Sequence, residues 1–118
     1  MSQEVVWLAS ASRTTTQTSA DIETASFNDL EVTVVTTVIG TGSITLTINA
    51  KDVASGTYRL LLSGAAITTN TTNVYKVSNF IPAVANVSAL DELPEIIQLV
   101  ITANNANPAT YSVGYDLN

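Results

Sequence analysis

The chain has 118 residues, the size of one domain, and its ten acidic and four basic residues give a net charge of −6. A negative surface repels phosphate backbones and anionic lipid headgroups, so we expect neither nucleic acid nor a membrane as a partner. The absence of cysteine and histidine excludes disulfides, thiolate metal sites and the commonest general base. We therefore expect no catalytic residue, no bound metal and no cofactor.

The first predicted strand covers residues 5–10 and is apolar on both faces. Val5 and Trp7 would lie on one face, with Val6 and Leu8 on the other. Trp7 is the only tryptophan; it is either a core residue, which we favour, or a contact anchor. This apolar run is too short to span a bilayer and lacks the basic flank of a secretion signal, so we expect a soluble chain made in the cytoplasm.

Residues 10–26 are polar, and Ile22 is the only large aliphatic residue among them. This composition predicts an extended arm or a long loop instead of a core element. Arg13 is the only positive charge in the first 50 residues. Its sequence context fits two interpretations equally: a salt bridge across a protein interface, or a solvated residue of the arm.

The longest β-branched run covers residues 30–39, and a strictly alternating strand follows over residues 43–50. Alternation puts three side chains of the second strand on one face, where we expect the core: Ile44, Leu46 and Ile48. Gly40 and Gly42 separate the two strands and tolerate a tight connection. We therefore predict that the two strands form a hairpin.

A turn is predicted at residues 51–56, where Asp52 can bond the local backbone and Gly56 closes the loop. In the strand that follows, we expect three side chains to point inward: Tyr58, Leu60 and Leu62. Shorter strands are predicted at residues 66–69 and 74–77.

The spacing of Ser88 and Asp91 resembles a capping box, which predicts about one helical turn before Pro94. Two alternating strands then cover residues 97–101 and 111–115, with a polar turn at 104–108.

Seven to nine short strands joined by polar turns are typical of an antiparallel β-sandwich. The sequence leaves two topologies open, a jelly roll and an immunoglobulin-like sandwich. We expect a single all-β domain over residues 1–118, with the polar arm or loop at residues 10–26.

Paired carboxylates are the remaining candidates for chemistry. The densest group, Asp91, Glu92 and Glu95, matches no metal-binding loop, so we interpret it as solvated charge. Asp29 and Glu31 would share one strand face, where they repel each other unless a cation or a basic partner lies near.

Three strands carry apolar residues on the face opposite their core set. With few charges in the chain, this pattern favours burial of those faces by neighbouring subunits over a monomer. Together with Trp7 and Arg13, the residues concerned make up the predicted interface: Val6, Leu8, Val35, Ile39, Ile96 and Val100.

A resemblance to a known family rests on several segments: Arg13-Thr14, residues 43–48, Lys51-Asp52, residues 55–58, Leu93-Pro94 and residues 110–114. Their layout resembles that of small virion structural proteins of tailed bacteriophages. The resemblance implies a capsid decoration or cement protein, commonly a homotrimer, bound to the major capsid protein on the outer surface of an icosahedral shell. It further implies that residues 10–26 lie across a capsid subunit or a neighbouring copy.

Other functions are kept as alternatives. A tail-tube or head-completion subunit would form rings, and a tail or fibre module would bind host carbohydrate through exposed aromatic and polar groups. An enzyme would have to rely on carboxylates alone, and we disfavour it.

Overall fold

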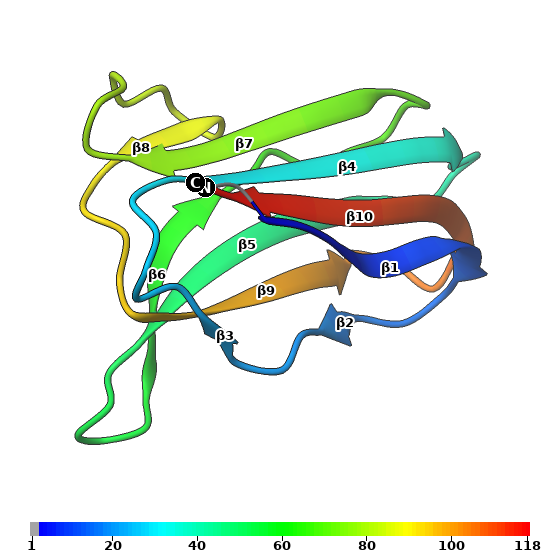
Figure 1. The fold of residues 1–118 in the computed structure, drawn as a ribbon. Coiled ribbons are helices and arrows are strands. Elements are labelled where there is room, and N and C mark those ends of the chain that lie inside the picture. Colours follow the sequence, from blue (N-terminus) through cyan, green and yellow to red (C-terminus); the bar gives the residue numbers. More distant parts are fainter. Residues whose placement is uncertain (1–2) are drawn as a thin grey trace.

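The computed structural model describes residues 3–118, which form two facing β-sheets (Figure 1). Sheet A has the strand order β1-β10-β4-β7-β8, and sheet B has the order β2-β9-β5-β6 with β3 also paired to β9. The strands are β1 Gln3–Arg13, β2 Gln17–Thr18, β3 Ile22–Glu23, β4 Leu30–Val38, β5 Ile44–Lys51, β6 Tyr58–Ser63, β7 Thr72–Ser78, β8 Ser88–Leu90, β9 Ile96–Ala103 and β10 Ala109–Leu117. The predicted all-β sandwich is confirmed, and residues 3–118 form ten strands where seven to nine were predicted.

The strand pairing is that of a jelly roll. The chain behaves as one long hairpin rolled into two layers: β1 pairs with β10, β2 and β3 pair with β9, β4 pairs with β7, and β5 pairs with β6. An immunoglobulin-like sandwich would instead pair the first strand with the second. The structure therefore decides between the two topologies that the sequence left open.

The core lies between the sheets, and period-two alternation supplies it from both. The predicted inward residues of β5 are almost fully buried, with Ile44 2%, Leu46 1% and Ile48 0% exposed. Sheet A contributes side chains of the same kind from β4, β7 and β10: Leu30, Val32, Val34, Val77, Val113 and Leu117. Among residues 3–118 there is no helix long and apolar enough to cross a membrane.

The predicted hairpin between residues 30–39 and 43–50 is wrong, because β4 belongs to sheet A and β5 to sheet B. The glycines form a corner between the layers instead. Gly40 has a φ of 53°, and the Gly42 amide donates a hydrogen bond of 2.7 Å to the Ile39 carbonyl. The register of β4 against β10 shifts next to Val38, so the alternation breaks there. Ile39, predicted on the outer face, therefore turns into the core.

Residues 10–26 pass from one sheet to the other: residues 10–13 complete β1 in sheet A, and β2 and β3 extend sheet B. β1 continues to Arg13, and β2 and β3 then line the edge of β9. Ser19, which lies between β2 and β3, and Thr24, which follows β3, are both buried. The Ser19 amide donates to the Leu99 carbonyl at 2.9 Å, and the Thr24 amide donates to the Glu95 carbonyl at 2.8 Å. Small polar side chains suit this edge because they can bond its free backbone groups.

The predicted turn at residues 51–56 is present, and Gly56 adopts a φ of 74°. The hairpin formed by β5 and β6 projects beyond the rest of the sandwich (Figure 1). Its outer part therefore has no opposite layer to pack on. Of the three side chains predicted to point inward, only Leu62 is buried, whereas Tyr58 is 40% and Leu60 61% exposed.

Two further local predictions are wrong. Residues 66–69 form only an isolated bridge, between Ile67 and Ile44. Residues 88–91 contain no helical turn, because Ser88 begins β8, which runs parallel to β7. The Ser88 hydroxyl donates to the Pro82 carbonyl at 2.9 Å and accepts from the Val84 amide at 3.1 Å, so it closes a loop and does not cap a helix.

Candidate interaction surface

The structure does not gather the predicted interface residues on one surface. Val6 on β1 is 73% exposed, and Val35 on β4 is half-buried on the same sheet. Ile96 and Val100 are half-buried on β9, in the other sheet. The other apolar members belong to the interior: Trp7 and Leu8 pack partly buried against the core, and Ile39 is 3% exposed.

The outer face of sheet A carries an uncharged row of side chains across four strands. Val6 on β1 lies opposite Gly114 on β10, Gly114 lies opposite Thr33 on β4, and Thr33 lies opposite Val74 on β7. A neighbouring row is also uncharged and consists of Ser112, Val35 and Thr72. We call these seven residues the sheet A face.

A row of carboxylates borders the sheet A face. Glu4 lies opposite Asp116, Asp116 opposite Glu31, and Glu31 opposite Lys76. Like charges on directly opposed residues destabilise a sheet, and this row has a single cation, with Lys76 Nζ 3.7 Å from Glu31 Oε2. Within residues 3–118, no group of three acidic side chains is arranged to hold a metal ion. A basic partner would relieve the repulsion.

Gly114 leaves a hollow in the sheet A face because it has no side chain. The shallow pocket above it measures about 420 Å³ and is lined by Val6, Thr33 and the acidic residues Glu4 and Asp116. An added Cβ on Gly114 would approach the Val5 carbonyl oxygen no closer than 3.4 Å, so the hollow is not filled by neighbouring backbone. Its shape and charge suit a long basic side chain from another protein.

Arg13 is engaged within its own subunit. Its guanidinium donates to the Tyr111 carbonyl oxygen at 2.6 Å and to the carbonyl oxygens of Ala9 and Ala11. It also lies over the Tyr111 ring, 4.8 Å from the ring centroid. These contacts join β1 to β10, and the salt bridge of Arg13 across a protein interface stays a prediction.

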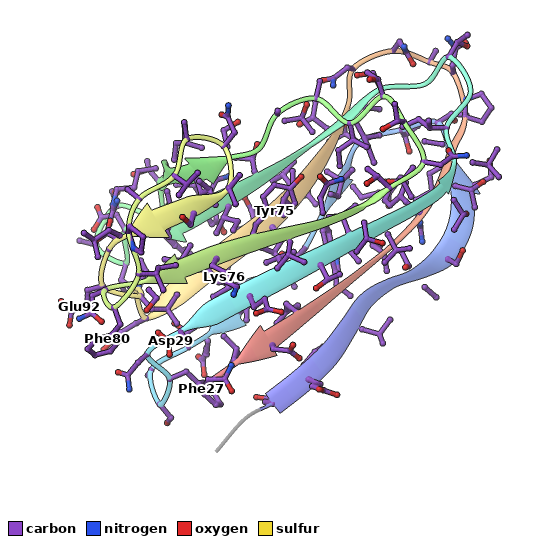
Figure 2. All side chains as sticks on the ribbon, turned by 90° about the horizontal axis from the view of Figure 1, so that it is seen from above. Phe27, Asp29, Tyr75, Lys76, Phe80 and Glu92 are labelled. Atoms are coloured by element: carbon purple, nitrogen blue, oxygen red, sulfur yellow. The ribbon has the colours of Figure 1, made fainter. Side chains whose placement is uncertain are left out.

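A second apolar surface, which sequence reasoning missed, lies at the β7–β8 connection. Phe80 is 77% exposed, and a groove of about 590 Å³ nearby is lined mainly by Val74, Ile81, Pro82, Val84 and Val87. Figure 2 shows Phe80 at the same end of the molecule as Asp29, Phe27 and Glu92. The indication in the sequence was the apolar run of residues 80–84. This run does not alternate as a strand does, so the pattern did not show that its side chains form an exposed apolar surface.

The fold is similar to that of a solved viral structure. A chain in the structure of infectious bursal disease virus, Gx strain, superposes with a TM-score of 0.50 at 14% sequence identity, over 99% of this chain and 31% of that one. This chain thus spans about a third of the length of the viral chain. No protein-family model and no curated protein matches the sequence. The similarity shows a shared fold, the jelly roll.

Proposed function

We propose that this chain is a non-enzymatic virion structural protein, a decoration subunit that binds the outer surface of an icosahedral phage capsid. Its partners would be the major capsid protein and further copies of itself, most simply in a homotrimer. The observation that carries this proposal is the sheet A face, which is uncharged across four strands. The fold shared with a chain of a virus structure supports a place in a virion.

The sheet A face suits protein contact because few polar groups must lose water there. Interface centres are depleted in charge, and charged groups are tolerated at the rim. Here the rim is the row of Glu4, Asp116 and Glu31. A basic side chain of the capsid lattice placed in the hollow above Gly114 would fix the orientation of the bound subunit.

Stabilisation of a shell needs no chemical step. A protein that binds the assembled lattice, but not its separated subunits, shifts the equilibrium toward the lattice by mass action. The binding free energies of many weak contacts, repeated over the shell, add up to a large total stabilisation. The net charge of −6 would also keep the decoration subunit away from packaged nucleic acid.

The test is to mix the purified chain with shells of the major capsid protein of the same virus, and to count bound copies by quantitative mass spectrometry. We expect hundreds of copies per shell and a higher melting temperature of decorated shells. Shells that bind no protein, or that melt at the same temperature with it, would contradict the proposal. A handful of copies at one vertex or on the tail would favour the tail or head-completion alternative.

A further inference from the structure

Another pocket shares two lining residues, Val74 and Val87, with the apolar groove. It is formed between residues 65–71, the start of β7 and the loop at residues 85–87, and measures about 360 Å³. Its polar lining consists of Thr68, Thr69, Thr71, Asn73, Tyr75 and Asn86. This volume falls in the usual range of small-molecule sites.

The walls of this pocket are held in place by backbone hydrogen bonds. Ile67 and Ile44 exchange two bonds, of 2.7 and 3.2 Å, which tie one wall to β5. The Lys76 amide donates to the Val87 carbonyl at 3.1 Å, which ties the other wall to β7. Such a pocket is largely formed before any ligand arrives, so little binding energy is spent on ordering it.

Hydrogen-bonding groups in the pocket are unused. Asn73 Nδ2 is buried and has no partner in the part of the chain that the structure describes. The pocket also contains the hydroxyls of Thr68, Thr69 and Thr71, which are exposed at its mouth. Because this nitrogen has almost no accessible surface, a ligand in the pocket reaches it only when the Asn73 amide turns about its Cβ–Cγ bond, and the donor then gains the partner that it lacks.

The lining sets the chemical class of the ligand. No charged residue lines the pocket, and its apolar part consists of aliphatic side chains, among them Ala65, Ala66, Ile67 and Val87. Without a cation in the lining, and with a net charge of −6 on the chain, an anionic ligand is disfavoured. A neutral ring with hydroxyls on its edge and C–H groups on its faces fits both kinds of lining.

We propose that this pocket binds one neutral sugar unit of a glycan. After a turn of its amide, Asn73 Nδ2 donates to a hydroxyl or ring oxygen of the sugar. The threonine hydroxyls bond the outer hydroxyls of the sugar, and the apolar residues contact its C–H face. The site adds carbohydrate binding to the structural role proposed above and does not depend on that role, because it is complete within one subunit.

The experiment is a titration of the full isotope-labelled chain with glucose, galactose, mannose, N-acetylglucosamine and sialic acid, followed by amide NMR spectra. We expect at least one neutral sugar to shift the Asn73 side-chain amide and the backbone amides of Thr69 and Asn86 in a saturable way, with dissociation constants in the millimolar range. Sialic acid should cause no such shift. Binding of sialic acid alone, or no shift with any of the sugars, would overturn the proposal.

Two variants and one control separate the pocket from the rest of the surface. Asn73→Ala and Thr71→Val should each weaken sugar binding at least about fivefold, because each removes one hydrogen-bonding group. Asn79→Ala, outside the pocket, should leave the binding unchanged. The dispersion of the NMR spectrum reports whether each variant is folded, and Thr71 is exposed, so its variant should fold even if Asn73→Ala does not. Unchanged sugar affinity in a folded variant would refute the assignment.

Discussion

Arg13 and Tyr111 contact each other in two ways at once. The Arg13 Nη1 atom donates to the Tyr111 carbonyl oxygen at 2.6 Å, while the guanidinium lies 4.8 Å from the centroid of the Tyr111 ring. The strand that Arg13 ends is an edge strand whose register against β10 shifts twice, between Val6 and Leu8 and between Leu8 and Ala11. These irregularities leave fewer ladder bonds, so Arg13 supplies contacts that a regular strand would not need.

We predict that Arg13→Ala lowers the free energy of unfolding by about 1–3 kcal/mol, because charged hydrogen bonds and a cation–π contact are lost together. Arg13→Lys should recover only part of this, since an ammonium lacks the planar fork that reaches several carbonyls. Denaturant unfolding of the three proteins measures the difference. Equal denaturation midpoints for the wild type and Arg13→Ala would show that the contacts of Arg13 with Tyr111 do not stabilise the fold.

A second prediction concerns Val6, the most exposed residue of the predicted interface. Val6→Lys should lower the free energy of unfolding by no more than about 0.5 kcal/mol, because surface substitutions have small effects. It should nevertheless weaken binding to capsid shells at least about tenfold, because it places a positive charge beside the hollow in which a basic side chain of the capsid would lie.

The matched control is Val53→Lys. Val53 is 66% exposed, close to the 73% of Val6, but lies in the turn of the projecting hairpin. Shell binding measured by cosedimentation should be unaffected by this change. If both variants lose binding equally, the contact surface is not the sheet A face.

The projecting hairpin is tied to residue 21 by a pH-sensitive contact. Lys51 Nζ lies 2.6 Å from Asp21 Oδ2, and the Tyr58 hydroxyl donates to Asp21 Oδ1. The hydrogen bond from Lys51, and then the one from Tyr58, lowers the pKa of the Asp21 carboxyl below its ordinary value. The hydrogen bond with Asp21 raises the pKa of Lys51, and also that of Tyr58.

These directions set the pH window of the contact. Because the pKa of Asp21 is lowered by folding, its carboxylate stabilises the fold above its unfolded pKa, and this stabilisation is lost as the pH falls through its folded pKa. The pKa values of Lys51 and Tyr58 are raised by folding, so the stabilisation from these two groups is lost as the pH rises through the raised values. We expect a carboxyl-detected NMR titration of Asp21 to show a midpoint below that of an ordinary aspartate, and Lys51→Met to move it upward. A midpoint that does not respond to Lys51→Met would disprove the contact.

The fourth prediction tests the packing of Tyr75 on Gly64. A Cβ added to Gly64 would lie 2.7 Å from Tyr75 Cε1, and the Tyr75 side chain is buried. Gly64→Ala should therefore lower the free energy of unfolding by about 1–3 kcal/mol, because the added methyl group overpacks the core. This loss exceeds the stabilisation that alanine gives by reducing the conformational freedom of the unfolded chain. Gly114→Ala, whose Cβ would meet nothing closer than 3.4 Å, is the control and should be nearly neutral in thermal unfolding. Similar losses in both variants would show that crowding by Tyr75 is not the cause.

Local patterns predicted the parts of this structure that depend on neighbours in the sequence. Period-two alternation identified the buried side of β5, and Gly56 with Asp52 identified the turn before β6. Each of these features is decided within a few residues, by the pleat of a strand or by a residue that accepts positive φ.

The candidate site was harder to predict. Val6 is exposed, but its neighbours on the sheet A face, Gly114 and Thr33, come from strands far away in the chain. No single strand carries the pattern that makes the face uncharged. Ile39 was placed wrongly for a related reason, because the register shift beside β10 reverses the direction of its side chain.

By itself, the sequence determined that the chain folds as strands and which side of most strands is buried, because alternation of apolar and polar residues is a property of each segment. The tertiary structure alone decided which strands pair, and so separated β4 from β5 into two sheets although only a short glycine corner joins them. The physical reason is that pairing is chosen by the burial of all strands together. The jelly roll brings β1 beside β10, and only that pairing creates both the sheet A face and the contact of Arg13 with Tyr111.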